Sequence, residues 1–326
     1  MGIDVGGTFT DMIAIDDKSY DIQVAKVPST KENQAIGVLK SLETFGSDLS
    51  SIDSIVHGTT VGTNLLVERN GAVCGLITTR GFRDNLELGR RGRPQVYGLL
   101  GNFEPLIPRN LRLEVRERIG ASGNVVEPLS ESDVLDAARL LLARGAEAIV
   151  IGFINSYVND VHECEARELV RTVWPNDNIA CSAEILPQFR EFERISTAAV
   201  NAYLQPKTSR YLMLLSDKLL ERRYTSDLLV MSGNGGVTDA RTAGRLCVNT
   251  ISSGPAAGVI AAAMIGQKAG FESIIACDMG GTSFDVSLVV GGRPRMTTQT
   301  QVSYGLPVQV SLIDIQSIGA GGGSTS

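Results

Sequence analysis

The sequence predicts an α/β protein with two lobes, and three observations support this class. Its 326 residues correspond to about two domains of ~150 residues each. Hydrophobic residues make up 43% and charged residues 20%, which is the balance of a globular protein that buries a core in each lobe. Helical and strand-like segments alternate along the first half of the chain, as α/β architecture requires.

The alternation is clearest from residue 130 onward. Ser130–Ala143 has helical periodicity, with Ser130 and Asp133 as a capping box, and Gly145 ends the helix. A continuous apolar run follows at once, as expected of a buried parallel strand. Three segments continue the alternation: the strand Ala146–Ile154, the helix Asp160–Val173 and the short strand Ile179–Ser182.

The second half begins with a long glycine-free segment. Pro187–Leu220 predicts a helix that breaks near Pro206 and connects the two lobes. We therefore expect an N-terminal lobe over 1–186 and a second lobe over 187–326. Three apolar runs of strand length follow among glycine loops: Leu228–Met231, Ser273–Cys277 and Val286–Val290.

Composition excludes several classes of function. The formal charge of −6 and the 5% aromatic content argue against nucleic acid as a partner. No apolar run approaches ~20 residues, so we expect no membrane partner. Two histidines and five scattered cysteines make a zinc cage improbable, and unpaired cysteines without a signal peptide predict a cytoplasmic location. The P-loop, Rossmann and serine-hydrolase motifs are absent from the sequence.

An internal repeat carries the strongest functional signal. Gly2–Asp11 (GIDVGGTFTD) and Ala276–Asp285 (ACDMGGTSFD) share five of ten positions, in the pattern D-x-G-G-T-x-x-D. The two aspartates that open the pattern, Asp4 and Asp278, are 274 residues apart (278 − 4). Each copy ends one apolar strand and begins another, so each predicts a glycine-turned β-hairpin.

The residue types of the repeat suit a nucleotide phosphate. Paired glycines let backbone N–H groups approach phosphate oxygens, and threonine hydroxyls add donors. Asp4 and Asp278 are the candidate catalytic residues and Mg²⁺ ligands, because Mg²⁺ takes one or two carboxylates and keeps several waters. The alternative is a pair of ordinary tight hairpins, but two matching copies with the same acid favour a ligand site. The candidate phosphate-binding residues are Gly6, Gly7, Thr8, Thr10, Gly280, Gly281, Thr282 and Ser283.

Three further segments are candidates with two readings each. The polar stretch His57–Asn64 follows the predicted strand Ile52–Val56 and holds either a substrate contact or a helix cap with a buried histidine. Arg90, in a glycine-rich loop with other arginines, binds an anion or lies in a solvated basic loop. Gly254 opens the predicted helix Ala256–Ile265, whose N-terminus suits an anion or is simply well capped. The candidate substrate residues are His57, Thr59, Thr60, Asn64 and Arg90.

The doubled hairpin resembles the superfamily of actin, sugar kinases and heat-shock 70 ATPases. Six motifs in order resemble, more specifically, the hydantoinase A and 5-oxoprolinase family. One difference is Gln316, where the family often has histidine. The motifs are GIDVGGTFTD (2–11), HGTTVGTN (57–64), LITTRGFRD (76–84), SSGPAAG (252–258), DMGGTS (278–283) and IGAGGGS (318–324).

This resemblance implies a function as well as a fold. It implies a two-lobed actin-like ATPase fold whose second lobe is incomplete here, because the family continues beyond the last motif. It also implies an A-type subunit that binds ATP and Mg²⁺, opens a small cyclic amide such as a hydantoin, 5-oxoproline or a lactam, and works with a hydantoinase B-type subunit or domain. The alternatives are the ATP-using subunit of an acetone or acetophenone carboxylase and a non-enzymatic, chaperone-like ATP switch.

Overall fold

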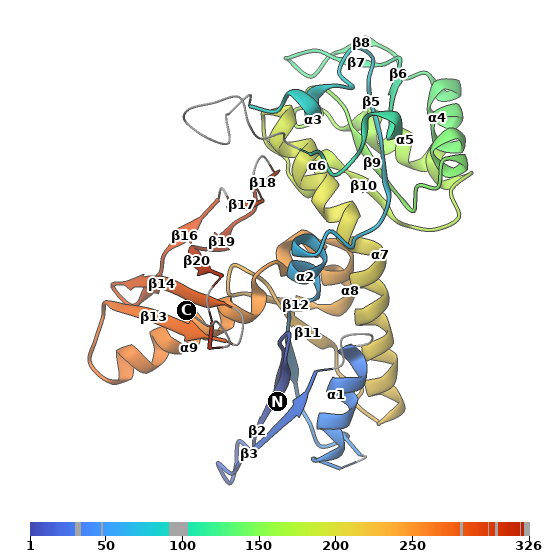
Figure 1. Ribbon diagram of the computed structural model, residues 1–326. Helices are drawn as coiled ribbons and strands as arrows, with labels where there is room; N and C mark the ends of the chain where they lie inside the picture. Colours follow the sequence, from blue (N-terminus) through green and yellow to red (C-terminus); the bar gives the residue numbers. More distant parts are fainter. Residues whose placement is uncertain are drawn as a thin grey trace. The chain divides into compact units, whose positions relative to one another are not determined.

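The computed structural model describes residues 1–29, 34–46, 48–90, 104–280, 283–298, 300–303, 306–319 and 321–322 (Figure 1). The chain forms two compact units, each assembled from separate stretches of sequence. These units are not divided at one point in the sequence, unlike the two lobes expected on either side of residue 186. The lobe boundary at residue 186 stays a prediction. Unit 1 comprises Met1–Asn64, Thr208–Thr298 and Ser311–Ser326, and unit 2 comprises Leu65–Lys207 and Gln299–Val310.

Unit 1 is built on a six-stranded mixed sheet in the order β12-β11-β4-β1-β2-β3. In it β1 pairs antiparallel with β2 and parallel with β4, and β11 runs parallel to β4. Helix α1 (Gln34–Glu43) packs on this sheet, with Val38 and Leu42 fully buried in the core. The strands are β1 (Gly2–Val5), β2 (Phe9–Ile15), β3 (Ile22–Pro28), β4 (Ile55–Thr59), β11 (Leu228–Met231) and β12 (Val237–Asp239).

A second, antiparallel sheet in unit 1 is covered on one face by helix α9 (Ser253–Lys268). Ala256, Val259 and Ala263 on α9 form a small core with Val289 of the sheet. The sheet consists of β13 (Ile274–Met279), β14 (Phe284–Val290), β15 (Arg293–Pro294) and β20 (Ile315–Ile318). Unit 1 also contains the strand pair β16 (Met296–Thr297) and β19 (Leu312–Ile313). Helix α8 (Ala240–Arg245) packs against β11 and β12 of the six-stranded sheet and against the 3-10 turn Cys247–Thr250.

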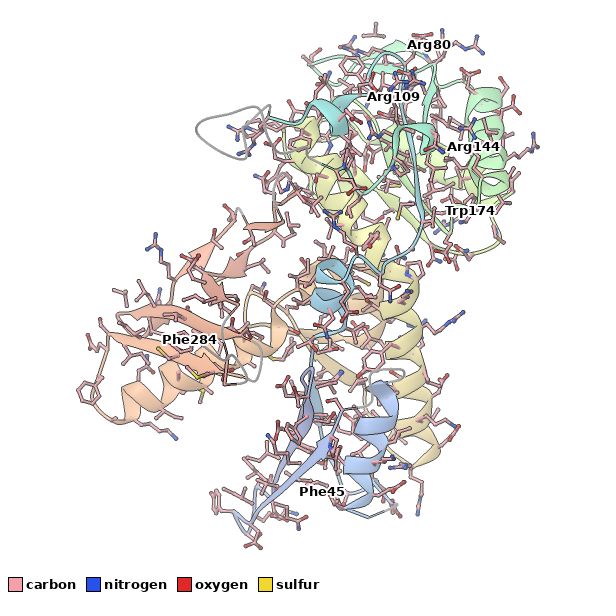
Figure 2. All side chains as sticks on the ribbon, viewed as in Figure 1. Phe45, Arg80, Arg109, Arg144, Trp174 and Phe284 are labelled. Carbon is pink, nitrogen blue, oxygen red and sulfur yellow. The ribbon has the colours of Figure 1, made fainter. Side chains whose placement is uncertain are left out.

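Unit 2 contains a parallel four-stranded sheet in the order β10-β9-β5-β6. All residues of β5 and β9 are buried, which explains their near-continuous apolar sequence. Trp174 and Arg144, labelled in Figure 2, belong to this unit, and Trp174 is buried. Its strands are β5 (Cys74–Thr79), β6 (Arg112–Val115), β9 (Ala148–Gly152) and β10 (Ile179–Cys181), and its main helices α4 (Glu131–Ala143) and α5 (Val161–Arg171).

Smaller elements complete unit 2. They are two short helices, one 3-10 turn and two hairpins. These elements are α3 (Asn85–Leu88), α6 (Ser182–Ile185), the 3-10 turn Arg109–Leu111, the hairpin β7 (Arg118–Ile119) with β8 (Val125–Glu127), and the hairpin β17 (Thr300–Ser303) with β18 (Leu306–Val308).

Helix α4 confirms the strongest local prediction. The Ser130 hydroxyl accepts a hydrogen bond from the Asp133 backbone N–H at 3.4 Å, which satisfies one of the free amides of the first turn. Gly145, just past the end of the helix, has φ of 82°. These signals are local in the sequence, so propensity and capping are sufficient to predict the helix.

The predicted break at Pro206 is wrong. Helix α7 (Glu191–Glu221) continues through Pro206 as one helix of 31 residues, from unit 2 into unit 1. A proline inside a helix costs ~3 kcal/mol, but α7 buries Leu204 and Leu212 completely, which outweighs this cost. Neither α7 nor any other helix among the described residues is long and apolar enough to cross a membrane.

Candidate functional site

The two predicted hairpins are confirmed, and they share one hydrogen-bonding register. In β1–β2, Asp4 lies opposite Asp11, and in β13–β14, Asp278 lies opposite Asp285. Each turn is closed by the same bond: Gly6 N–H donates to the Phe9 carbonyl, and Gly280 N–H donates to the equivalent Ser283 carbonyl, both at 2.9 Å. The sequence repeat is therefore also a structural repeat, and both copies belong to unit 1.

One oxygen of the Asp4 carboxylate lies close to glycines from two other motifs. Gly58 is the direct partner of Asp4 across β1–β4, and a Cβ atom added there would lie 2.9 Å from Asp4 Oδ1. A Cβ atom at Gly254, in the first turn of α9, would lie 3.1 Å from the same oxygen. A larger residue at either position would push the carboxylate aside. The D-x-G-G-T, HGTT and SSGPAAG motifs thus converge at Asp4.

The electrostatics of this position favour a bound cation. Asp4 retains exposed surface, yet its pKa is raised, first by partial burial of the carboxylate and then by the negative charges of Asp11 and Asp278. Lys26 opposes this shift, but its ammonium is 2.7 Å from Asp11 and largely satisfied there. A cation between Asp4 and Asp278 would relieve their repulsion.

The donor set suits Mg²⁺ better than a softer metal. Both side chains offer hard carboxylate oxygens, which Mg²⁺ prefers. Among the described residues no group of three or more histidine, cysteine, aspartate or glutamate side chains is arranged to hold a metal. The two carboxylates fit an ion that completes its shell with waters and phosphate oxygens.

Several candidate residues form the open side of the hairpins. Gly7 and Thr8 are exposed at the first turn, and Asp278 and Gly280 are exposed at the second. Ser283 is half-buried beside them, and Gly281 and Thr282 lie outside the described residues. Gly322 of the IGAGGGS motif joins this group, because its N–H donates to the Gly280 carbonyl at 3.0 Å.

Thr10, in contrast, supports the first turn from its buried side. Its side chain is fully buried, and its hydroxyl lies 3.1 Å from the Ser29 hydroxyl. Ser29 in turn donates to the Gly6 carbonyl at 2.8 Å. A direct phosphate contact by Thr10 stays a prediction, whereas its link to the turn through Ser29 is observed. Ser29 is a residue that sequence reasoning missed, since it lies outside every motif.

The HGTT motif and the start of α9 are hydrogen-bonded to each other. The Ser253 hydroxyl donates to the Thr59 carbonyl at 2.9 Å and accepts from the Thr59 N–H at 3.3 Å. The Thr60 hydroxyl donates to the Val5 carbonyl at 2.9 Å, and the Asn64 amide lies 3.4 Å from the Thr60 hydroxyl. These bonds fix both segments against the strand that carries Asp4.

The sequence left two alternatives for His57: a substrate contact, or a buried histidine whose hydrogen bonds are satisfied within the protein. The geometry is that of the buried histidine. It is completely buried; Nδ1 lies 3.3 Å from the Ile3 carbonyl, and Nε2 lies 2.8 Å from the Tyr211 hydroxyl. A carbonyl only accepts, so Nδ1 carries the proton and Nε2 accepts from Tyr211. Burial lowers the pKa of His57 to about 4, so the ring is neutral.

We expect His57 to remain neutral well below its ordinary pKa. The unfolded chain takes up a proton near pH 6.5, whereas the folded chain does so only near pH 4. The stability due to neutral His57 is therefore complete above pH 6.5 and is lost as pH falls from 6.5 to about 4, by up to ~3 kcal/mol. Nitrogen-15 NMR is a direct measurement, because the chain has only two histidines and His162→Gln assigns the signals. A His57 midpoint near 6.5 would contradict the assignment.

Arg90 belongs to unit 2 and has a protein partner. Its Nε lies 2.5 Å from the Glu193 carboxylate, and its side chain is about half exposed (47%). Its predicted contact with substrate stays a prediction. Gln316, on β20, donates to the Asp314 carboxylate at 3.0 Å, so it has a local structural contact.

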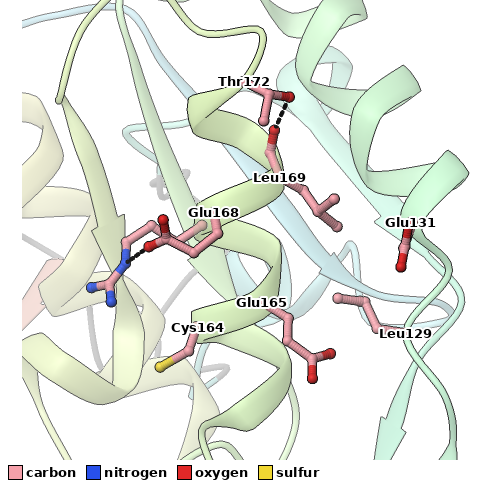
Figure 3. Close-up of a pocket in the computed structure, with 8 residues that line it drawn as sticks. Leu129, Glu131, Cys164, Glu165, Glu168, Leu169 and Thr172 are labelled. Atoms are coloured by element: carbon pink, nitrogen blue, oxygen red, sulfur yellow. Dashed lines mark hydrogen bonds and ion pairs between the residues drawn. The ribbon is translucent and has the colours of Figure 1, made fainter.

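A hollow of about 600 Å³ lies elsewhere in unit 2, between α5 and the segment that leads into α4 (Figure 3). Arg167 and Glu168 form an ion pair at 3.5 Å within it, and Thr172 donates to the Leu169 carbonyl at 2.7 Å. None of the predicted site residues lines this hollow. It offers no convergent set of polar groups for catalysis.

Comparison with known proteins gives the family. A family model described as "Hydantoinase/oxoprolinase N-terminal region" matches residues 1–174, and one described as "Hydantoinase/oxoprolinase" matches residues 194–326. The chain belongs to the hydantoinase/oxoprolinase family. The expectation drawn from the six ordered motifs is thus confirmed.

Relatives in this family carry out different reactions. The chain is 36% identical to the acetophenone carboxylase gamma subunit of Aromatoleum aromaticum, over 99% of this chain and 46% of the relative. It matches a nucleotide-free acetone carboxylase structure with a TM-score of 0.87 at 33% identity, covering 98% of this chain and 48% of that one. It matches the ATP-dependent caprolactamase of Pseudomonas jessenii with a TM-score of 0.83 at 33% identity, covering 99% and 48%.

These likenesses confirm the α/β class with parallel strands. The chain spans about half the length of these carboxylase and caprolactamase relatives. The hydantoinase/oxoprolinase family therefore includes both carboxylase subunits and a cyclic amide hydrolase at similar distances from this chain.

Proposed function

We propose that this chain is the ATP-binding subunit of an ATP-dependent enzyme that opens a cyclic amide. The observation that carries this proposal is the pair of matched hairpins, whose aspartates Asp4 and Asp278 influence each other electrostatically. The order of the six-stranded sheet, with β1, β2 and β3 as an antiparallel meander and β4 parallel to β1, supports an actin-like ATPase unit.

Each group of residues has a proposed role in binding MgATP. Asp4 and Asp278 hold Mg²⁺, which supplies positive charge against the phosphates when it is bound. The exposed hairpin turns, with Gly7 and Thr8 in one and Gly280 in the other, present backbone amides to the phosphate oxygens. Thr60 and Asn64, which are both half-buried, are the proposed substrate contacts. Catalysis consists chiefly of positioning and charge stabilisation.

The proposed reaction balances with two waters. The amide oxygen attacks the γ-phosphorus of ATP, and ADP leaves. Water adds to the amide carbon, the C–N bond breaks, and the ring nitrogen takes a proton, leaving an acyl phosphate. A second water attacks the acyl carbon and releases phosphate, which carries the original amide oxygen. The products are ADP, inorganic phosphate and the open-chain amino acid.

An oxygen label tests this reaction directly. The complete protein, a B-type partner subunit and MgATP are incubated with a lactam or hydantoin that carries ¹⁸O at the scissile carbonyl. Phosphorylation of the amide oxygen requires the label to appear in inorganic phosphate, detected by mass spectrometry. Unlabelled phosphate, with its new oxygen drawn from water, would instead indicate a conformational motor of the chaperone-like class.

A second candidate is the ATP-using subunit of a ketone carboxylase. The similarity to acetophenone carboxylase and to acetone carboxylase favours it, and the same ATP site would phosphorylate an enolate oxygen. Substrate stimulation separates the candidates. ATP hydrolysis that rises with a cyclic amide supports the amidase, whereas hydrolysis that rises only with a ketone and bicarbonate supports the carboxylase.

A further inference from the structure

A buried chain of hydrogen bonds leads from helix α7 to the strand that carries Asp4. Tyr211, on α7, donates to His57 Nε2 at 2.8 Å, and His57 Nδ1 donates to the carbonyl of Ile3 at 3.3 Å. All three of these residues are buried within unit 1, so water does not replace a lost partner.

The direction of each bond in this chain is fixed. The Ile3 carbonyl can only accept, which places the imidazole proton on Nδ1. His57 Nε2 then can only accept, so the Tyr211 hydroxyl donates to it. Each group has one arrangement that satisfies it, and such fully satisfied networks rigidify the segments they join.

The strands held by this chain are the ones that position the Asp4 carboxylate. Ile3 precedes Asp4 on β1, and His57 precedes Gly58 on β4, where Gly58 is the register partner of Asp4. Asp4 Oδ1 lies close to β4 and to α9, since added Cβ atoms at Gly58 and Gly254 would lie 2.9 and 3.1 Å from it. A small shift between β1 and β4 would therefore move the carboxylate.

We infer that Tyr211 is a positioning residue, which acts through His57 to hold β1 and β4 in the register that aims the Asp4 carboxylate. This inference rests on the proposed function, in which Asp4 holds Mg²⁺ for ATP hydrolysis. Tyr211 contacts neither phosphate nor metal in this role. It links α7 to the candidate site across 154 residues of sequence.

A second tyrosine, which bonds to the same strand β4, provides a matched control. Tyr224 is also a buried tyrosine of the same core, and its hydroxyl accepts from the Ile55 N–H at 2.9 Å and lies 3.0 Å from the Asp227 carbonyl. Tyr224 bonds to Ile55 at the start of β4, whereas Tyr211 bonds to His57, the residue next to Gly58. Both phenylalanine variants lose a buried hydroxyl, but only Tyr211→Phe releases His57.

The test compares ATP hydrolysis by the complete protein with its partner subunit. Tyr211→Phe should lower kcat at least about tenfold with the KM for ATP within about twofold, since small misplacement of a reacting group is costly. Tyr224→Phe should leave kcat within about twofold. His57→Leu should lower kcat like Tyr211→Phe, and the double variant should lose no more than Tyr211→Phe alone. A wild-type kcat in Tyr211→Phe, or an equal loss in Tyr224→Phe, would overturn the inference.

A readout without nucleotide separates this inference from the proposed function. The ¹³C chemical shift of the Asp4 carboxyl, assigned with Asp4→Asn, should change in Tyr211→Phe and stay at its wild-type value in Tyr224→Phe. If the wild-type protein did not hydrolyse ATP, the proposed function would be wrong. The ¹³C shift of the Asp4 carboxyl would still decide whether Tyr211 positions Asp4. An unchanged shift in Tyr211→Phe would show that Tyr211 does not position Asp4.

Discussion

Asp4→Asn and Asp278→Asn are each expected to lower ATP hydrolysis at least about 100-fold while nucleotide affinity changes only a few-fold. Each substitution keeps the size of the side chain and removes its charge. The hairpin amides proposed to hold phosphate remain, because the register of Asp4 with Asp11, and of Asp278 with Asp285, depends on backbone bonds. Calorimetry measures binding, and a phosphate-release assay measures turnover.

The second aspartate of the first hairpin is the control for this prediction. Asp11 carries the same charge directly opposite Asp4, but both of its carboxylate oxygens are bound by Lys26, at 2.7 and 3.0 Å. We expect Asp11→Asn to reduce turnover less than about fivefold, as for a paired surface charge. Wild-type turnover in Asp278→Asn would remove Asp278 from the mechanism, and equal losses in Asp4→Asn and Asp11→Asn would point to net charge alone.

The largest effect on stability is expected at Glu163 in unit 2. This fully buried carboxylate accepts from Phe153 N–H at 2.9 Å, from Ala183 N–H at 2.9 Å and from the Ser182 hydroxyl at 2.6 Å. Ser182 also accepts from Arg194 Nε at 3.1 Å, and Arg194 is buried as well. Burial raises the pKa of Glu163 despite its three donors.

Glu163→Ala should lower the free energy of unfolding by about 3–5 kcal/mol. It leaves three buried donors without an acceptor, at about 1–3 kcal/mol each before relaxation, and it opens a cavity. Urea denaturation gives the free-energy difference. Glu165→Ala, on the exposed face of the same helix α5, is the control and should change stability by less than about 0.5 kcal/mol. Similar losses in both variants would show that helix propensity, not the buried network, explains the effect.

Local signals in the sequence predicted much of the fold. Helix α4 and strand β9 were predictable because a capping serine, a stop at Gly145 and a fully apolar run each act within a few residues. The hairpins were predictable because D-x-G-G-T repeats with the same spacing, and equal spacing gives an equal register. Strand β4 shows the limit: the expected strand Ile52–Val56 is Ile55–Thr59, because buried partners allow His57 and Thr59 inside a strand.

Helix α7 shows what propensity alone misjudges. Pro206 predicts a break from its own covalent structure, which removes a donor. The helix continues because residues on either side of Pro206, such as Leu204 and Leu212, are fully buried, each in the unit to which it belongs. Hydrogen bonds from distant residues also anchor the helix next to the proline. Ala72 N–H donates to the Tyr203 carbonyl at 2.9 Å, and the Lys207 ammonium donates to the Asn70 carbonyl at 2.7 Å. These partners lie more than 130 residues away in the sequence.

The sequence by itself determined the family, the α/β class, the two matched hairpins and the aspartates at their first positions, since these depend on residue type and short spacing. Only the tertiary structure decided which candidates surround Asp4. Parallel pairing of β1 with β4 brings Gly58 to Asp4, the first turn of α9 brings Gly254, and α7 places Tyr211 against His57. The physical reason is that strand pairing and core packing join residues 54 to 250 positions apart, and no local pattern encodes which of them meet.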